Sequence, residues 1–210
     1  FYFIRKVSFK DLKKIKNNLN YFDFIINTSI NKNYIFNKYN SNFDQDLEIS
    51  KYITNSKTIY CFISTRKIYR NKSNLTENSK LRPICNYSKN KLITEKKLKK
   101  YLNNNLLILR VSNIIGPKKN SINLHETFID IFQKNFEKGI IFDNNKSFKD
   151  FLSIDKFCQI IKKIISKKLV GTYNLSIGQK VYLNDLINWL TKYSHKQLVK
   201  KKIFNKEKSF

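Results

Sequence analysis

A tyrosine and a lysine four positions apart, Tyr87 and Lys91, are the residues of this chain whose types and spacing suggest chemistry. On a helix, this spacing places two side chains on one face. An ammonium group beside a phenol favours the phenolate, and a phenol tuned in this way can pass a proton to or from a hydroxyl or carbonyl. The pair therefore predicts an acid/base centre.

The spacing alone is a weak signal. The chain has 12 tyrosines and is rich in lysine, so about two such pairs are expected by chance. Two others occur, Tyr2/Lys6 and Tyr34/Lys38. The first lies in a segment predicted to be a strand, where the two side chains would stand roughly 13 Å apart, and the second in an Asn-rich segment predicted to be a loop. The alternative is that Tyr87 and Lys91 are incidental residues on an exposed helix.

Elements around the pair predict how it is positioned. Short, nearly continuous apolar runs are typical of buried parallel strands, and they occur at 23–29, 57–65 and 105–112. Helical spacing covers 43–53 and 86–102. This alternation predicts a doubly wound α/β sheet. Ligands bind at the carboxyl ends of such strands, so Thr65, where the second strand ends, is predicted to hydrogen-bond a substrate oxygen.

The pattern changes after residue 116, and we expect a first domain over 1–115 and a second over 116–210. The second contains short predicted strands and amphipathic helices, namely 139–143, 171–176, 124–136, 154–167 and 182–193. Asp155 is predicted to cap the middle helix. No glycine precedes Gly116, although a dinucleotide-binding domain needs a Gly-rich first turn where its backbone approaches a pyrophosphate.

The formal net charge of +27 suggests a polyanionic partner. Most of the cations are lysines, and they are scattered through predicted helices and loops rather than gathered in one stretch. We therefore expect no nucleic acid partner, although the field would help to attract a small anionic substrate.

Other compositional features narrow the class of protein. Three cysteines without a paired spacing, Cys61, Cys85 and Cys158, are predicted to be buried thiols of a reduced, cytoplasmic protein. The two histidines, His125 and His195, lie far apart, which argues against a metal site. No apolar run approaches the ~18 residues that a membrane span requires, so no membrane association is expected.

The order of several motifs resembles the extended short-chain dehydrogenase/reductase family, the NAD(P)-dependent epimerases, dehydratases and reductases that modify sugar nucleotides. The matching segments cover nearly the whole chain: DFIINTS, NSNFDQDLEI, CFISTRKIYR, LTENSKLRPICNYSKNKLITE, LILRVSNIIGP, SFKDFLSIDKF and GTYNLSIGQKVYLNDL. The resemblance implies a Rossmann-type sheet, which here lacks its first strand–turn–helix, and a smaller α/β substrate-binding domain. The simplest explanation of the missing turn is a truncation of roughly 45 to 60 residues at the N-terminus.

The resemblance also implies roles for individual residues. Thr65 would orient the substrate, Tyr87 would be the acid/base, and Lys91 would bind the cofactor ribose and tune Tyr87. The cofactor, NAD or NADP, would further be lined by Thr28, Ser29, Asn42 and Ser112. The substrate diphosphate would be bound by Asn113 and by Lys149, which stands where the family has an arginine and offers a point charge in place of a bidentate fork.

Departures from the family pattern narrow the kinds of reaction that the resemblance implies. Dehydratases of this family carry an Asp-Glu pair directly after the catalytic threonine, and here Arg66 and Lys67 stand there. Cations cannot do that acid/base work. Arg70 also replaces a family glycine. An epimerase or a keto-sugar reductase acting on a nucleotide-sugar substrate remains, and the sequence does not separate them.

The alternative function is a non-catalytic nucleotide- or protein-binding remnant of the same fold. The resemblance further implies a role in polysaccharide biosynthesis and a homodimer formed through the long helices of the first domain. The sugar, the nucleotide and the choice between NAD and NADP are left open.

Overall fold

The computed structural model describes most of the chain, namely residues 3–54, 57–69, 74–116, 128–142, 147–194 and 199–201. Two compact units make up the fold. The first comprises Phe1–Val111 with Ile161–Leu175, and the second Ser112–Ile160 with Ser176–Phe210. Each unit is built around its own strands, and each is described by itself below.

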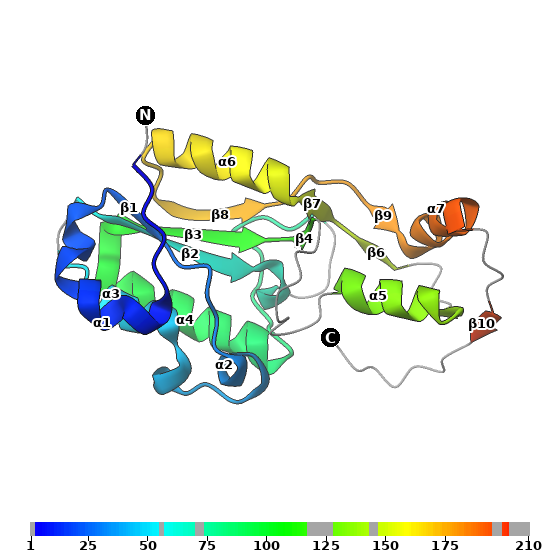
Figure 1. Cartoon of the computed structure of the whole chain (residues 1–210), viewed down its shortest axis with the longest axis horizontal. Coiled ribbons are helices and arrows are strands. Elements are labelled where there is room, and N and C mark those ends of the chain that lie inside the picture. Colours follow the sequence, from blue (N-terminus) through cyan, green and yellow to red (C-terminus); the bar gives the residue numbers. More distant parts are fainter. Residues whose placement is uncertain are drawn as a thin grey trace. The chain divides into compact units, whose positions relative to one another are not determined.

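A parallel four-stranded sheet forms the centre of the first unit (Figure 1), and its strand order is β1-β2-β3-β8. The strands are β1 (Phe24–Ile26), β2 (Ile59–Thr65), β3 (Leu106–Val111) and β8 (Gly171–Leu175). The two central strands are buried along nearly their whole length, as expected for a parallel sheet. The predicted α/β parallel sheet is confirmed.

Helices cover one face of this sheet (Figure 1). The main ones are α2 (Lys32–Phe36), α3 (Gln45–Ser50) and α4 (Asn86–Leu102), and the first residues form η1 (Phe9–Asp11), α1 (Leu12–Ile15) and η2 (Lys16–Tyr21). Asp44 caps α3, because its carboxylate accepts the backbone N–H of Leu47 at 3.0 Å. The seventeen-residue α4 ends at Leu102, because the next residue, Asn103, has a φ of 45° that a helix cannot continue.

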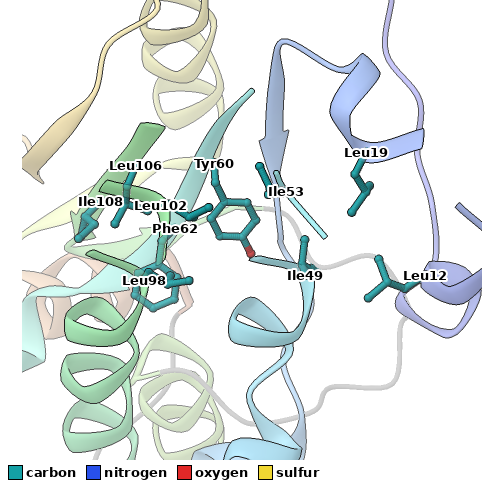
Figure 2. Close-up of a cluster of buried hydrophobic side chains, with 10 residues drawn as sticks. All are labelled: Leu12, Leu19, Ile49, Ile53, Tyr60, Phe62, Leu98, Leu102, Leu106 and Ile108. Atoms are coloured by element: carbon teal, nitrogen blue, oxygen red, sulfur yellow. The ribbon is translucent and has the colours of Figure 1, made fainter. Parts of the chain in front are cut away.

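The core of the first unit lies between the sheet and these helices. Side chains of one strand alternate between the two faces, and the register pairs Tyr60 with Leu106 and Phe62 with Ile108. Figure 2 shows these four with their apolar partners from the helices and the N-terminal segment, namely Leu12, Leu19, Ile49, Ile53, Leu98 and Leu102. The face of the sheet that bears this cluster also bears Ser64 and Arg110, the next pair in the same register.

Some expectations for the first unit are wrong. Residues 3–7 form no strand, and Phe3 and Ile4 are 86% and 85% exposed. Tyr34 does not lie in a loop but in α2, where it is buried. Of the cysteines, Cys61 is buried, but Cys85 is only partly buried and Cys158, in the second unit, is exposed. All are free thiols, and burial raises the pKa of Cys61 to about 12.

Short paired strands and helices make up the second unit. The strand pairs are β4 (Asn113–Ile115) with β7 (Phe151–Ser153), β5 (Ile140–Phe142) with β10 (Val199–Lys201), and β6 (Phe148–Lys149) with β9 (Val181–Tyr182). The helices are α5 (Phe128–Glu137), α7 (Leu183–Ser194) and the first part of α6 (Ile154–Ser166), whose second half belongs to the first unit. Phe128 stacks on Phe132 along α5, and Trp189 on α7 is exposed.

The cap of α6 differs from the prediction. The hydroxyl of Ser153 accepts the backbone N–H of Lys156 at 3.2 Å, so Ser153 caps the helix and Asp155 lies in its first turn. Arg70, His125 and His195 lie outside the described residues.

Candidate active site

Helix α4 presents Tyr87, Lys91 and Glu95 at successive intervals of four residues, which places them in a row on one face. Lys91 and Glu95 are buried, and Tyr87 is partly buried. This row faces the sheet, because Lys91 and Glu95 both bond to residues of β2. The predicted pairing of Tyr87 with Lys91 on one helix therefore has the expected helical geometry.

Lys91 is held tightly although it carries an ammonium group. Its Nζ donates a hydrogen bond of 2.8 Å to the backbone carbonyl of Ile63 and lies 3.7 Å from a carboxylate oxygen of Asp46. It also lies over the ring of Phe62, 4.4 Å from the centroid, and 5.7 Å from the ring centroid of Tyr34. These contacts from β2, α3 and α2 fix the ammonium at the carbonyl of Ile63, which precedes Thr65 by two residues on β2.

Glu95, one turn further along α4, forms a buried ion pair with Arg110. The guanidinium donates to both carboxylate oxygens, from Nε at 3.2 Å and from Nη2 at 2.8 Å. Glu95 also accepts the hydroxyl of Ser64 at 2.5 Å. Burial opposes the charge of Arg110, but the bonds to Glu95 and Tyr69 outweigh it and raise the pKa of the guanidinium. The pair ties α4 to β2 and β3 beside Thr65.

Thr65 is buried where β2 ends, as predicted from the sequence. Its hydroxyl oxygen accepts the backbone N–H of Lys67 at 3.2 Å and so caps the short helix η4 (Arg66–Ile68). Among the described residues, no hydrogen bond joins Thr65 to Tyr87. Burial lowers the pKa of Lys67, the second of the two cations that follow Thr65.

A second row on α4, one residue earlier, faces α2. Asn90 donates to the backbone carbonyls of Tyr34 and Asn37 at 2.8 and 2.9 Å, and Asn86 donates to that of Phe36 at 2.8 Å. The hydroxyl of Thr94 is within 2.7 Å of the Tyr34 hydroxyl. Burial raises the pKa of Tyr34 well above its ordinary value, and charges on Asp44, Asp46 and Tyr87 add to this. This row therefore fixes α2 beside the first row.

The loop after β1 contains two predicted cofactor residues, Thr28 and Ser29, which are both exposed. Ser29 is anchored by Asn27, whose side-chain oxygen accepts its backbone N–H at 2.9 Å and its hydroxyl at 2.7 Å. A small hollow lies here, lined by Ser29, Ile30, Asn31, Tyr34, Phe43, Gln45 and Asp46. Asn42 is exposed on η3 (Ser41–Phe43) and does not line this hollow.

In the second unit, Asp150 organises the segments that contain Asn113 and Lys149. Its backbone carbonyl accepts the side-chain amide of Asn113 at 2.9 Å and its backbone N–H at 3.3 Å. Its carboxylate accepts three successive backbone N–H groups, those of residues 177–179, at 3.1, 2.6 and 3.1 Å. The ammonium of Lys149 lies 5.1 Å from the ring centroid of Phe128. Ser112 has a buried hydroxyl without a hydrogen-bond partner among the described residues.

Sequence reasoning assigned no role to several residues that hold this site. Glu95 and Arg110 lie within quoted motifs, and the signal that could have found them was the interval of four that continues from Tyr87 through Lys91 to Glu95. Asp46, Asn27 and Asp150 are ordinary polar residues in the sequence. Their roles depend on distant contacts that spacing cannot reveal.

Comparison with known proteins agrees with this architecture. The family model described as "NAD dependent epimerase/dehydratase family" matches residues 13–176. The chain therefore belongs to the NAD dependent epimerase/dehydratase family, which confirms the resemblance found in its motifs. No curated protein sequence matches the chain significantly.

Solved structures of similar fold come from several enzymes. UDP-N-acetylglucosamine 4-epimerase from Methanobrevibacter ruminantium M1, in complex with UDP-N-acetylmuramic acid, has a TM-score of 0.72 at 16% identity over 92% of this chain and 67% of its own. UDP-glucuronic acid 4-epimerase from Bacillus cereus, in complex with NAD, has 0.71 at 19% over 90% and 65%. The dTDP-4-dehydrorhamnose reductase from Bacillus anthracis, in complex with NADP, has 0.64 at 16% over 93% and 68%. The chain thus spans about two thirds of each, and these likenesses establish its Rossmann-type fold.

Within the described residues, every helix is too short or too polar to span a lipid bilayer. No group of three or more His, Cys, Asp or Glu side chains is placed to hold a metal ion in the part of the chain that the structure describes.

Proposed function

We propose that this chain catalyses hydride and proton exchange at a sugar carbon of a nucleotide-sugar, as an NAD(P)-dependent epimerase or keto-sugar reductase. The observation that carries the proposal is the buried ammonium of Lys91, fixed on the carbonyl of Ile63 and one helical turn from Tyr87. A buried cation beside a phenol favours the phenolate, which is the form that accepts a proton from a substrate hydroxyl. Membership of the family supports this reading.

One feature of the described residues fits a nicotinamide dinucleotide. The buried Ser112 hydroxyl lacks a protein hydrogen-bond partner among the described residues. Thr28, Ser29, Asn42, Tyr87, Lys91 and Ser112 are the residues that we propose to hold it. When bound, a nicotinamide supplies the hydride acceptor or donor. Residues 1–115 hold no glycine, so we assign no residue to the pyrophosphate.

The remaining steps belong to the side chains of the chain itself. Tyr87 takes or gives the proton at the sugar oxygen, and Lys91 supplies a positive charge one helical turn away. The Thr65 oxygen accepts the Lys67 N–H, which leaves its own O–H to orient the sugar. In the second unit, Asn113 and Lys149 bind the diphosphate. The side-chain amide of Asn113 donates one hydrogen to the backbone carbonyl of Asp150, and its second hydrogen would bind an anionic oxygen of the diphosphate.

Exchanging Tyr87 for phenylalanine tests the acid/base role. We expect Tyr87→Phe to lower kcat by a factor of about 10² or more, because general acid/base catalysis contributes that much. Tyr101→Phe is the matched control, since Tyr101 lies on the same helix and is exposed. Lys91→Met forms a second pair with Lys99→Met, its control at an exposed position of the same helix.

The substrates to assay are UDP- and dTDP-linked sugars with NAD or NADP, and the products separate the two reactions. An epimerase converts one sugar into its isomer without net consumption of cofactor, whereas a reductase consumes NAD(P)H in proportion to the product. Retained turnover in Tyr87→Phe would remove this residue from the mechanism. Tight nucleotide binding without turnover by the parent protein would overturn the enzyme proposal in favour of a non-catalytic binding remnant.

A further inference from the structure

Asp46 forms an ion pair with Lys91, but the proposed function gives Asp46 no role. Both side chains are almost fully buried, at 6% and 8% exposure, and Nζ lies 3.7 Å from Oδ2. The nearest hydrogen-bond acceptor of Lys91 is the neutral carbonyl of Ile63. Because a buried ammonium loses most of its hydration, one carbonyl compensates only part of the cost, and a carboxylate compensates much more.

Asp46 is itself held so that Oδ2 faces Lys91. Its other oxygen, Oδ1, accepts the hydroxyl of Tyr60 at 2.7 Å and the side-chain amide of Asn27 at 3.0 Å. Burial raises the pKa of Asp46, and Lys91, Tyr60 and Asn27 oppose that rise. The two neutral donors thus fix the carboxylate, and Lys91 supplies its counter-charge.

The surroundings of the ammonium offer few other charges. The rings of Tyr34 on α2 and Phe62 on β2 face it, and Asp44, at the start of α3, contributes a negative charge near Asp46. Tyr87 lies one turn earlier on its own helix. Through Asn27, which binds both Asp46 and Ser29, the ion pair also connects α4 with the loop after β1.

From this geometry we propose that Asp46 is the buried counter-ion that keeps Lys91 charged and holds its ammonium against β2. It is a positioning residue for the acid/base centre, which it reaches only through Lys91. The effect of Asp46 on catalysis rests on the proposed function, whereas its ion pair with Lys91 can be tested without cofactor or substrate. Without the carboxylate, the buried ammonium of Lys91 loses its counter-charge and gives up its proton more readily.

Trace acylation with acetic anhydride tests this directly, because only an unprotonated amine reacts. We expect Asp46→Asn to raise the rate at Lys91 about tenfold near pH 8, the factor that corresponds to one unit of proton affinity. The rate at each lysine is measured by mass spectrometry. Glu48→Gln is the matched control, since Glu48 lies on α3 two residues away and pairs with the exposed Lys51 at 2.7 Å; it should leave Lys91 unchanged.

The pH dependence of the acylation rate at Lys91 distinguishes two effects of Asp46→Asn: loss of the negative charge, and greater exposure of Lys91 in a loosened fold. If Asp46 acts through charge, the ratio of the two rates falls towards one at high pH, where Lys91 is unprotonated in both proteins. A ratio that stays constant with pH, or equal rates throughout, overturns the proposal.

Should Asp46→Asn fail to fold, Lys91→Met reports on the same pair from the other side. Loss of the ammonium should raise the pKa of the Asp46 carboxyl by at least about one unit, as followed by carbon NMR of the labelled side chain. An unchanged Asp46 titration contradicts the ion pair. An inactive parent protein that still shows the acylation effect would refute only the proposed function, and an active protein without the effect would refute only the role of Asp46.

Discussion

The two polar rows of α4 differ in the kind of group that they bury. The row that faces the sheet carries full charges, Lys91 and Glu95, each paired with an opposite charge. The row that faces α2 carries neutral groups, Asn86, Asn90 and Thr94. They bind backbone carbonyls and the hydroxyl of Tyr34, and Thr94 also donates to the carboxylate of Asp44 at 2.6 Å. A buried charge that loses its partner costs far more than a buried amide or carbonyl does. Substitutions in the sheet-facing row should therefore lower the free energy of unfolding more than substitutions in the row that faces α2.

The largest effect is expected from Glu95→Gln. This change leaves the guanidinium of Arg110 buried without a counter-charge, so the free energy of unfolding should fall by about 3–5 kcal/mol, as measured by urea denaturation. The double variant Glu95→Leu/Arg110→Leu should recover most of the loss, because a buried ion pair and an apolar pair of similar volume are often nearly equivalent. A loss below about 1 kcal/mol in the single variant would contradict the ranking of the two rows.

A smaller loss is expected from Asn90→Ala on the row that faces α2. Two backbone carbonyls, those of Tyr34 and Asn37, lose their side-chain donor, which should lower the free energy of unfolding by about 1–3 kcal/mol. Asn86→Ala removes a single bond and serves as the control. If Asn90→Ala destabilised the protein more than Glu95→Gln, the distinction between charged and neutral rows would be wrong.

The smallest effect concerns Glu77, at the exposed outer end of the sheet-facing network. Its carboxylate accepts the backbone N–H of Asn174 at 2.7 Å, and this bond holds the pKa of Glu77 below its ordinary value. Because the folded pKa is the lower one, the stabilisation is present above the unfolded value and is lost as pH falls through the folded value.

Amide exchange at Asn174, followed from neutral to acid pH, measures this loss. Exchange corrected for its intrinsic pH dependence should accelerate only in the acid range, and Glu77→Gln should abolish that step. A step of the same size in Glu77→Gln would assign it to another carboxylate.

Much of the first unit could be predicted because its pattern is local. The range 86–102 is reproduced by α4 at both ends, since its boundaries are marked by a change in spacing. The strands β2 and β3 follow from continuous apolar runs. The predicted strand is absent at residues 3–7, where Phe3 and Ile4 are apolar yet exposed, because a strand forms only where a partner strand accepts its hydrogen bonds.

The site was predictable only in part, for a related reason. Spacing found Tyr87 and Lys91 because both lie on one helix. It could not find Asp46, which lies 45 residues away in sequence and meets Lys91 only when α3 packs beside α4. Asp150 was missed in the same way, because its partners at residues 177–179 follow it by 27 to 29 positions.

The single tryptophan of the chain is Trp189, exposed on α7 in the second unit, whereas tyrosines such as Tyr34, Tyr60 and Tyr69 are buried in the first. Indole fluorescence consequently reports on one unit alone, and ultraviolet absorbance of the phenols reports chiefly on the other. A single melting experiment with both optical signals distinguishes one cooperative transition from two, without any label or engineered probe.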